Sequence, residues 1–408
     1  MNLTKELKRK RFLMMLSSAL AIFFTGFPHV WSVYQPYAME QAGWSQTQAS
    51  MCFYLALGIF VFGNIYGGRM MEVKGAKKVM WVGGGIFSVG VVLSAFLIMP
   101  NPILFYITYG AMQGFGQGMI YTTIIATAQK WFPGRTGFAS VIVVTANGLC
   151  GFFLAPLSRM LLGKIGPQYT LFVIGIMVVV AWLASSILFA DPDKELQPAA
   201  ETNVQIAEES KKQYTSAEMV KTKKFYYLLA TMCFGLMSYF MISPISQSYQ
   251  MEIGIQGSIA ITAVMIGSMM NAATRLLLPT AADKIGRIPC IQVILIVCAV
   301  AMGILGITKS GIVTIMIIVV YGCYGGIMGS FPSFTSSIFG IKHSGENYGY
   351  VMFGLVIATF GAPAIVSTIT ASGLGMNVVF LIGMLFAVAA LISLQFLKKE
   401  LRREDSCL

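Results

Sequence analysis

The feature that most constrains this 408-residue chain is a series of long apolar runs along nearly its whole length. Each has about 20 or more residues, enough for a helix to cross roughly 30 Å of hydrocarbon. Backbone groups in lipid must bond within their own segment, so the runs predict an all-α polytopic membrane protein. We predict twelve transmembrane helices, near residues 12–36, 48–71, 79–99, 103–128, 138–162, 168–190, 225–251, 258–282, 289–308, 312–338, 348–371 and 376–397.

Composition excludes several classes of protein. Only 11% of the residues are charged, whereas soluble proteins carry roughly a quarter, which excludes an ordinary soluble enzyme, a nucleic-acid-binding domain and a disordered chain. Seven scattered Cys without a C-x-x-C pair, and two His in all, predict neither disulfides nor a metal site. The spans contain no nucleophile–base pair and no paired carboxylates, and the chain has no nucleotide-binding motif. We therefore expect no enzyme activity and no cofactor. Transport would draw its energy from ion or solute gradients.

The basic residues predict the topology. With the N-terminus in the cytoplasm, 24 Lys and Arg fall inside, three fall outside, and Arg275 lies within a span. This asymmetry follows the positive-inside rule and explains the net charge of +12 without nucleic acid as a partner. The first run follows five basic residues and has no small-residue cleavage site, so we interpret it as an uncleaved anchor. We expect a monomer in the lipid bilayer of a bacterial inner (plasma) membrane, with both termini cytoplasmic.

The polar stretch at residues 191–223 predicts a flexible cytoplasmic linker between two six-helix halves, residues 1–190 and 224–408. Three pairs of motifs repeat at an offset of 211 or 212 residues: Glu72-x-x-Gly75 with Asp283-x-x-Gly286, Tyr109-Gly110 with Tyr321-Gly322, and Gly137 with Gly349. Two parallel repeats predict pseudo-symmetric halves, with a substrate site between them at the membrane midplane.

The segments that follow spans 2 and 8 resemble the signature of the major facilitator superfamily. That signature has an acidic residue, two further positions, a Gly and then basic residues, as in segments 68–78 and 283–287. The second copy departs from it, with Pro279 in place of the leading Gly. The resemblance implies a cytoplasmic gate in which acidic and basic groups latch helix ends and Gly permits a tight turn. The gating residues it implies are Glu72, Gly75, Lys77, Asp283, Gly286 and Arg287. The alternative for each is simple loop anchoring.

Within that superfamily, the chain most resembles the oxalate/formate antiporter family and the related monocarboxylate transporters. The matching segments are spread over nearly the whole chain, at residues 31–34, 130–137, 271–275, 331–333 and 347–349. As a set they indicate the family, but they do not indicate one substrate.

Arg275 is the charge that lies well inside a span, roughly 12 Å along the helix from Asp283. A buried Arg in a membrane is costly and usually faces a cavity with a partner. No Asp or Glu lies in the interior of a predicted span, so a substrate carboxylate fits as the partner of this planar fork of donors. The matching Arg of the resembled family favours this role. The alternative is an Arg that snorkels to the cytoplasmic surface.

Aromatic and hydroxyl side chains in other spans are candidates for a cage around the anion. We predict substrate-binding roles for His29, Tyr34, Tyr121, Asn271, Tyr321, Tyr324 and Tyr350, together with Arg275. A Tyr hydroxyl can donate to a carboxylate while its ring excludes water. Each aromatic has the alternative of core packing. His29 can titrate near neutral pH, so it is a candidate for proton transfer or for neutral packing.

Two departures from the resembled family refine the prediction. The oxalate carriers have a second intramembrane cation in span 11, where residues 350–357 contain none, so a dicarboxylate is disfavoured. Some monocarboxylate transporters have an Asp four residues before the span 8 Arg, where this chain has Asn271. We therefore predict a secondary transporter of a small carboxylate anion of the lactate, pyruvate or formate type, with the proton as a candidate coupled ion. An oxalate/formate-type exchanger, a drug exporter and a non-transporting sensor remain the alternatives.

Overall fold

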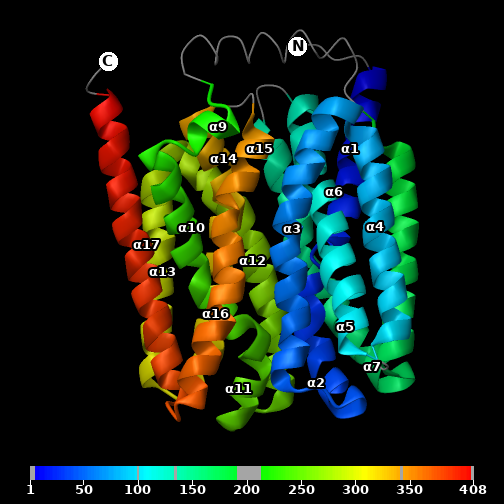
Figure 1. The fold of residues 1–408 in the computed structure, drawn as a ribbon, viewed down its shortest axis with the longest axis vertical. Coiled ribbons are helices and arrows are strands. Elements are labelled where there is room, and N and C mark those ends of the chain that lie inside the picture. Colours follow the sequence, from blue (N-terminus) through cyan, green and yellow to red (C-terminus); the bar gives the residue numbers. More distant parts are fainter. Residues whose placement is uncertain (1–4, 99–100, 133–135, 191–212, 341–342, 406–408) are drawn as a thin grey trace. The chain divides into compact units, whose positions relative to one another are not determined.

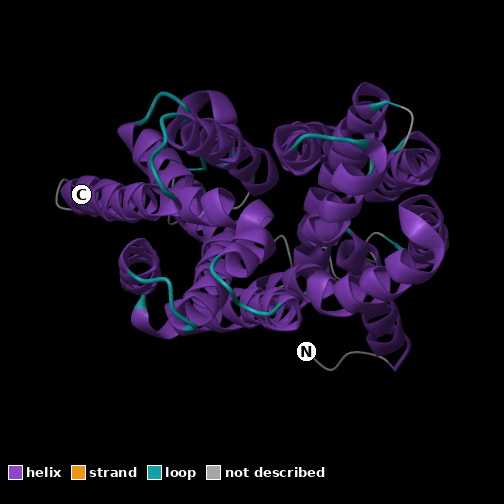
Figure 2. Cartoon of the chain, turned by 90° about the horizontal axis from the view of Figure 1, so that it is seen from below, coloured by secondary structure: helices purple, strands orange, loops and turns teal. Residues whose placement is uncertain are grey.

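A computed structural model describes residues 5–98, 101–132, 136–190, 213–340 and 343–405. These residues form helices joined by short turns, and no strand occurs among them (Figures 1 and 2). Many large apolar side chains are exposed on the outward faces of the helices, which suits a lipid environment. The prediction of an all-α membrane protein is confirmed.

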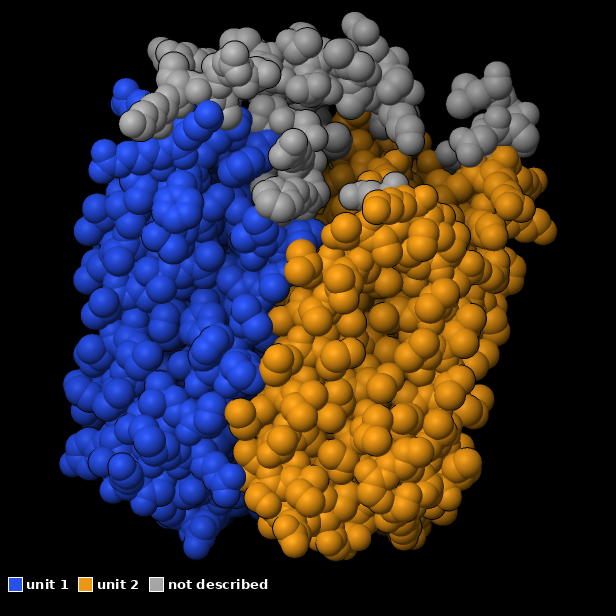
Figure 3. All heavy atoms as spheres, turned by 180° about the vertical axis from the view of Figure 1, so that it is seen from behind, with its two compact units in different colours: residues 1–212 blue, residues 213–408 orange. Residues whose placement is uncertain are grey.

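The chain divides into two compact units, residues 1–212 and 213–408 (Figure 3). The division falls inside the predicted linker 191–223, of which residues 191–212 lie outside the described part. Residues 213–223 belong to unit 2, where Thr215 and Glu218 form a capping box and the Tyr214 N–H donates to Phe339 O. The assignment of residues 1–190 and 224–408 as halves joined by a linker stays a prediction.

The helices of each unit follow the predicted spans. Unit 1 contains α1 (Lys5–Phe24), η1 (Phe27–Val30), α2 (Trp31–Ala42), α3 (Gln46–Lys74), α4 (Ala76–Leu97), α5 (Pro102–Phe105), η2 (Tyr106–Met112), α6 (Gln113–Trp131) and α7 (Thr136–Leu188). Unit 2 contains α9 (Ser216–Met219), α10 (Lys223–Ile242), η3 (Ser243–Ile245), α11 (Ser246–Glu252), α12 (Gly257–Ile285), α13 (Arg287–Ile307), α14 (Ile312–Phe339), α15 (Ser344–Val351), α16 (Phe353–Ala371) and α17 (Met376–Asp405).

Ten helices among the described residues are long and apolar enough to cross a membrane. One of them, Val141–Leu188, contains a non-helical residue, Gly166, that separates two predicted spans. The predicted fourth span is divided into α5, η2 and α6, because residues 106–112 form a π-helix. The merged helix α7 and the divided fourth span are compatible with twelve spans, and that number stays a prediction.

The first span of each unit is broken, a feature that the apolar pattern did not predict. In unit 1 the α-helix ends at Phe24 and a 3-10 turn with Pro28 precedes α2. In unit 2 a 3-10 turn with Pro244 separates α10 from α11. Proline removes one helical hydrogen bond and clashes with the preceding turn, so it accounts for both breaks.

The predicted repeat is visible in α3 and α12, which have 29 residues each and begin 211 residues apart. Gly75 ends α3 with φ of 80°, and Gly286 ends α12 with φ of 101°. Residues with a side chain rarely adopt this region. Both glycines therefore allow a turn between consecutive helices, and their role in gating stays a prediction.

Helix packing repeats as well. In unit 1, α3 packs on α6, and α4 on α7. In unit 2, α12 packs on α14, and α13 on α17. The two units are therefore built on the same plan, and the α12–α14 pair positions the candidate site.

Candidate functional site

Arg275 lies on α12 with only 1% of its surface exposed. Its Nε–H donates to Asn271 Oδ1 at 2.8 Å, one helical turn earlier. Its Cζ lies 5.7 Å from the centre of the Tyr324 ring on α14, within cation–π range. These contacts with an amide oxygen and an aromatic ring orient the guanidinium.

Three tyrosines pack against one another beside Arg275. We call the residues Asn271, Arg275, Tyr239, Tyr321 and Tyr324 the Arg275 cluster. The Tyr324 ring stacks on Tyr239 of α10 at 3.9 Å. The Tyr321 ring meets the Tyr239 ring edge-on, with 5.1 Å between the ring centres. All five residues are buried. The cluster therefore joins one cation to a layer of aromatic rings contributed by α10 and α14.

Hydroxyl groups of the broken first span of unit 2 border this layer. The Tyr321 hydroxyl lies 3.3 Å from Ser243 Oγ and 3.2 Å from Ser246 Oγ. Ser246 donates in turn to the carbonyl of Ser243, at 3.1 Å. The break at Pro244 thus places two hydroxyls beside the Tyr321 hydroxyl.

Small residues on α14 explain the close approach of α12. A Cβ on Gly329 would lie 2.8 Å from Arg275 Cα and 2.9 Å from its carbonyl oxygen. Thr274 Oγ1 donates to Gly322 O at 2.7 Å, across the same interface. The glycines therefore let the two backbones meet where Arg275 and Tyr324 must face each other.

A model of the Major Facilitator Superfamily matches residues 12–363. The chain belongs to the Major Facilitator Superfamily. Over 386 residues it is 25% identical to the oxalate:formate antiporter of Oxalobacter formigenes, covering 93% of this chain and 89% of that protein. It is 24% identical over 356 residues to the uncharacterized MFS-type transporter YhjX of Escherichia coli strain K12, covering 86% of each. A 121-residue region, 30% of this chain and 25% of the relative, is 30% identical to human monocarboxylate transporter 11.

Membership in this superfamily makes the chain an integral membrane transporter rather than an enzyme, as predicted. Among the described residues, no group of three or more His, Cys, Asp or Glu could hold a metal ion.

Of the predicted substrate-binding residues in unit 2 of this Major Facilitator protein, four come together in the Arg275 cluster: Asn271, Arg275, Tyr321 and Tyr324. The fifth, Tyr350, lies on α15 and is partly exposed. Its ring centre lies 6.2 Å from that of Phe353.

The three predicted residues of unit 1 occupy separate environments there. Tyr34 is buried on α2, where its hydroxyl donates to Ser158 Oγ at 2.9 Å. Tyr121 is buried on α6 with its ring 5.2 Å from that of Phe60. His29 is partly exposed in η1, with its ring 6.0 Å from Phe53. Their predicted roles in binding stay predictions.

The predicted gating residues lie at the ends of α3 and α12 and the starts of α4 and α13. Glu72 and Lys77 are exposed, and Arg287 is partly exposed. The side chain of Asp283 lies outside the described part. A latch between these charges therefore stays a prediction, although both glycine turns that it requires are present.

Sequence reasoning missed Tyr239, Ser243 and Ser246, because no intramembrane charge or motif marks them. Ser243-Pro244 in the middle of an apolar run was one available signal, since it indicates an interrupted helix. A second signal was the spacing of Gly322, Gly325 and Gly329, which places residues without side chains on the face of α14 that packs against α12.

Proposed function

We propose that this transporter carries a small monocarboxylate of the lactate, pyruvate or formate type, with Arg275 binding the carboxylate. The observation that supports this most is a 1% exposed guanidinium on a membrane-spanning helix, beside an amide and an aromatic ring. An Arg at the centre of a membrane helix costs about 2.5–3.5 kcal/mol on insertion scales. Binding of an anionic substrate at this position would offset that free-energy cost.

The geometry of the cluster suits a carboxylate. Because the Asn271 amide accepts from Nε, it fixes the plane of the guanidinium, whose two terminal amino groups form the fork that matches a carboxylate. Tyr321, Ser243 and Ser246 supply hydroxyls that border the aromatic layer. The rings of Tyr239 and Tyr324 exclude water and so strengthen the ion pair.

Charge count favours one carboxylate over two. Arg275 is the cation that lies well inside a predicted span, and residues 350–357 of span 11 contain no basic residue. Oxalate/formate-type exchange is the second candidate, supported by the similarity to the Oxalobacter formigenes antiporter. Asn271 in place of a carboxylate removes an Asp–Arg proton switch, so a coupled proton would pass with the bound carboxylate or through His29.

The remaining parts of the proposal concern the cycle and its setting. We place the gate at Glu72, Gly75, Lys77, Asp283, Gly286 and Arg287, and the protein as a monomer in a bacterial inner membrane with cytoplasmic termini. The 24-to-3 distribution of Lys and Arg supports the orientation.

The test is counterflow in proteoliposomes that are loaded with unlabelled lactate, pyruvate, formate or oxalate and offered labelled lactate or formate outside. We expect accumulation with monocarboxylates inside, and its loss in Arg275→Gln. Arg159→Gln, an exposed Arg on α7, is the matched control and should retain transport.

The outcomes separate the candidates. Accumulation with oxalate inside, at a rate equal to that with lactate, would favour the exchanger. Folded protein that accumulates no carboxylate would point to a drug exporter, and carboxylate binding without flux would point to a sensor. Equal transport by Arg275→Gln and the native protein would remove Arg275 from the site.

A further inference from the structure

The last helix, α17, has two faces of different character. Leu394, Leu397 and other inner residues are buried where α17 packs on α10 and α13. The opposite face carries an exposed apolar stripe of Leu385, Val388, Ile392 and Phe396, between 39% and 60% exposed. These four recur at helical spacing, so the stripe runs straight along the helix.

Basic residues continue this stripe without a change of face. At 3.6 residues per turn, Lys399 and Arg403 lie directly beyond Ile392 and Phe396, and both are exposed. Gln395, Lys398 and Arg402 lie on the flank of the same stripe. The apolar face therefore ends in a cluster of cations, which we call the α17 basic cluster (Gln395, Lys398, Lys399, Arg402 and Arg403).

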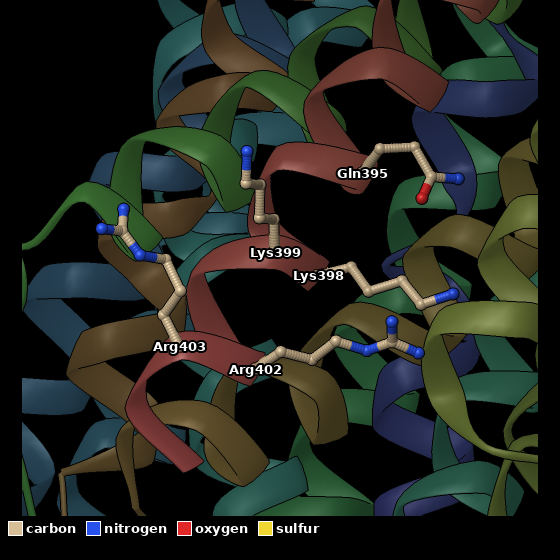
Figure 4. A pocket seen from close by; sticks show the side chains of 5 residues that line it. All are labelled: Gln395, Lys398, Lys399, Arg402 and Arg403. Carbon is tan, nitrogen blue, oxygen red and sulfur yellow. The ribbon is translucent and has the colours of Figure 1, made fainter. Parts of the chain in front are cut away.

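The α17 basic cluster lines a hollow of about 370 Å³ (Figure 4). The Lys398 and Arg402 side chains leave α17 toward the same side, one helical turn apart (Figure 4). Like charges at this spacing repel one another. The lining consists of one amide and four cations. Such a lining favours an anion that can accept from several donors at once.

We propose that the α17 basic cluster binds the phosphodiester headgroup of an anionic phospholipid whose acyl chains lie on the Leu385–Phe396 stripe. A phosphate accepts a guanidinium side-on and an ammonium as a point charge. The stripe argues for a lipid over free phosphate, because one amphiphile can occupy both adjoining surfaces. Clusters of Lys and Arg at the end of a membrane helix have the charge that attracts anionic headgroups.

The test is native mass spectrometry of the full-length protein, mixed with equal amounts of phosphatidylglycerol and phosphatidylcholine with the same acyl chains. We expect phosphatidylglycerol to be retained preferentially. In Lys399→Gln/Arg403→Gln that preference should fall on the order of tenfold, as two charges leave the headgroup site. Lys221→Gln/Lys223→Gln removes the same charge from exposed positions elsewhere in unit 2 and should keep the preference.

Two further arms make the proposal falsifiable. Lys399→Arg keeps the charge and should bind like the native protein, which separates charge from folding. Glycerol 3-phosphate and inorganic phosphate carry the headgroup chemistry without acyl chains. If either displaces phosphatidylglycerol at low millimolar concentration, the site is one for free phosphate and the lipid proposal is wrong. Equal retention of both lipids, or equal loss in the control variant, also overturns it.

Discussion

Units 1 and 2 share a plan but differ at one matched position in their second spans. Position 64 of α3 corresponds to position 275 of α12, because the helices begin 211 residues apart. Asn64 and Arg275 are each 1% exposed. Each also bonds to the residue four earlier: Asn64 Nδ2 donates to Phe60 O at 3.0 Å, and Arg275 Nε to Asn271 Oδ1 at 2.8 Å. The scaffold is the same, but the charge is present on one side only.

The neighbours of each residue match its chemistry. Asn64 also accepts from the Thr122 hydroxyl on α6, so an amide between two helices ties them together. Arg275 instead faces the ring of Tyr324. The comparison teaches that both units can share the same glycine turns and apolar helices. The side chain at one buried position then decides whether that position links two helices by a hydrogen bond or carries a charge.

The largest effect is expected from making unit 2 resemble unit 1. Arg275→Asn removes the cation and should lower carboxylate counterflow at least about 100-fold, since a buried charge-assisted pair with the substrate is lost. Asn64→Ala should cost about 1 kcal/mol of stability, typical of an interhelical hydrogen bond, and leave substrate affinity close to native. Counterflow and thermal unfolding in detergent would measure the two effects. Comparable loss of substrate affinity in both variants would contradict the comparison.

A smaller effect should follow when a carboxylate is placed beside the charge. In Asn271→Asp the new side chain pairs with Arg275 and competes with the substrate, so uptake at pH 7.5 should fall about tenfold. Pairing with Arg275 favours the ionised carboxylate, so the loss should persist as the pH is lowered from 7.5 to about 5.5. Initial rates across this range, with Asn271→Gln as the neutral control, measure the effect. Native uptake by Asn271→Asp would show that Asn271 does not position Arg275 in this way.

Overpacking the α12–α14 contact should have a moderate effect. A Cβ at Gly329 would meet the Arg275 backbone at 2.8 Å, so Gly329→Ala should destabilise unit 2 by about 1–3 kcal/mol and slow uptake severalfold. Gly311→Ala, where nothing lies within 4 Å of the added carbon, is the matched control and should be neutral. Unfolding temperature and uptake should change together, and a normal Gly329→Ala protein would argue against close packing here.

The smallest effect should come from the ring that covers the guanidinium. Tyr324→Phe keeps the aromatic face and should change the apparent KM for the carboxylate less than about twofold. Tyr324→Leu removes a cation–π contact of about 1 kcal/mol, which corresponds to roughly fivefold. Concentration dependence of uptake would separate the two. If Tyr324→Phe and Tyr324→Leu have the same apparent KM, the side chain contributes its volume and not the charge distribution of an aromatic ring.

The frame of the fold was predictable because its causes are local. Apolar length predicted the spans, and Gly75 and Gly286 predicted the turns, since a positive φ suits residues without a Cβ. Arg275 and Asn271 were predictable as neighbours because four residues make about one helical turn. Tyr321 and Tyr324 were also predicted, and the structure places them with the Arg.

What escaped prediction depends on which helix faces meet. Tyr239 joins the cluster because α10 presents it to α14, and nothing in the sequence of span 7 specifies that register. The predicted continuous first span, 12–36, is interrupted near Pro28, since an apolar run does not reveal where a 3-10 turn replaces α-helix. The roles of Tyr34, Tyr121, His29 and Tyr350 also depend on tertiary placement, and they stay predictions.

The π-helical stretch Tyr106–Met112 has a genetic consequence. A π turn holds roughly one residue more than an α turn. Loss of a single codon there can be absorbed as a return to α geometry, with the flanking segments keeping their faces. The same loss in α12 between Asn271 and Arg275 would rotate one against the other by about 100°. Span 4 is thus a place where the length of the gene can drift, whereas span 8 is one where it cannot.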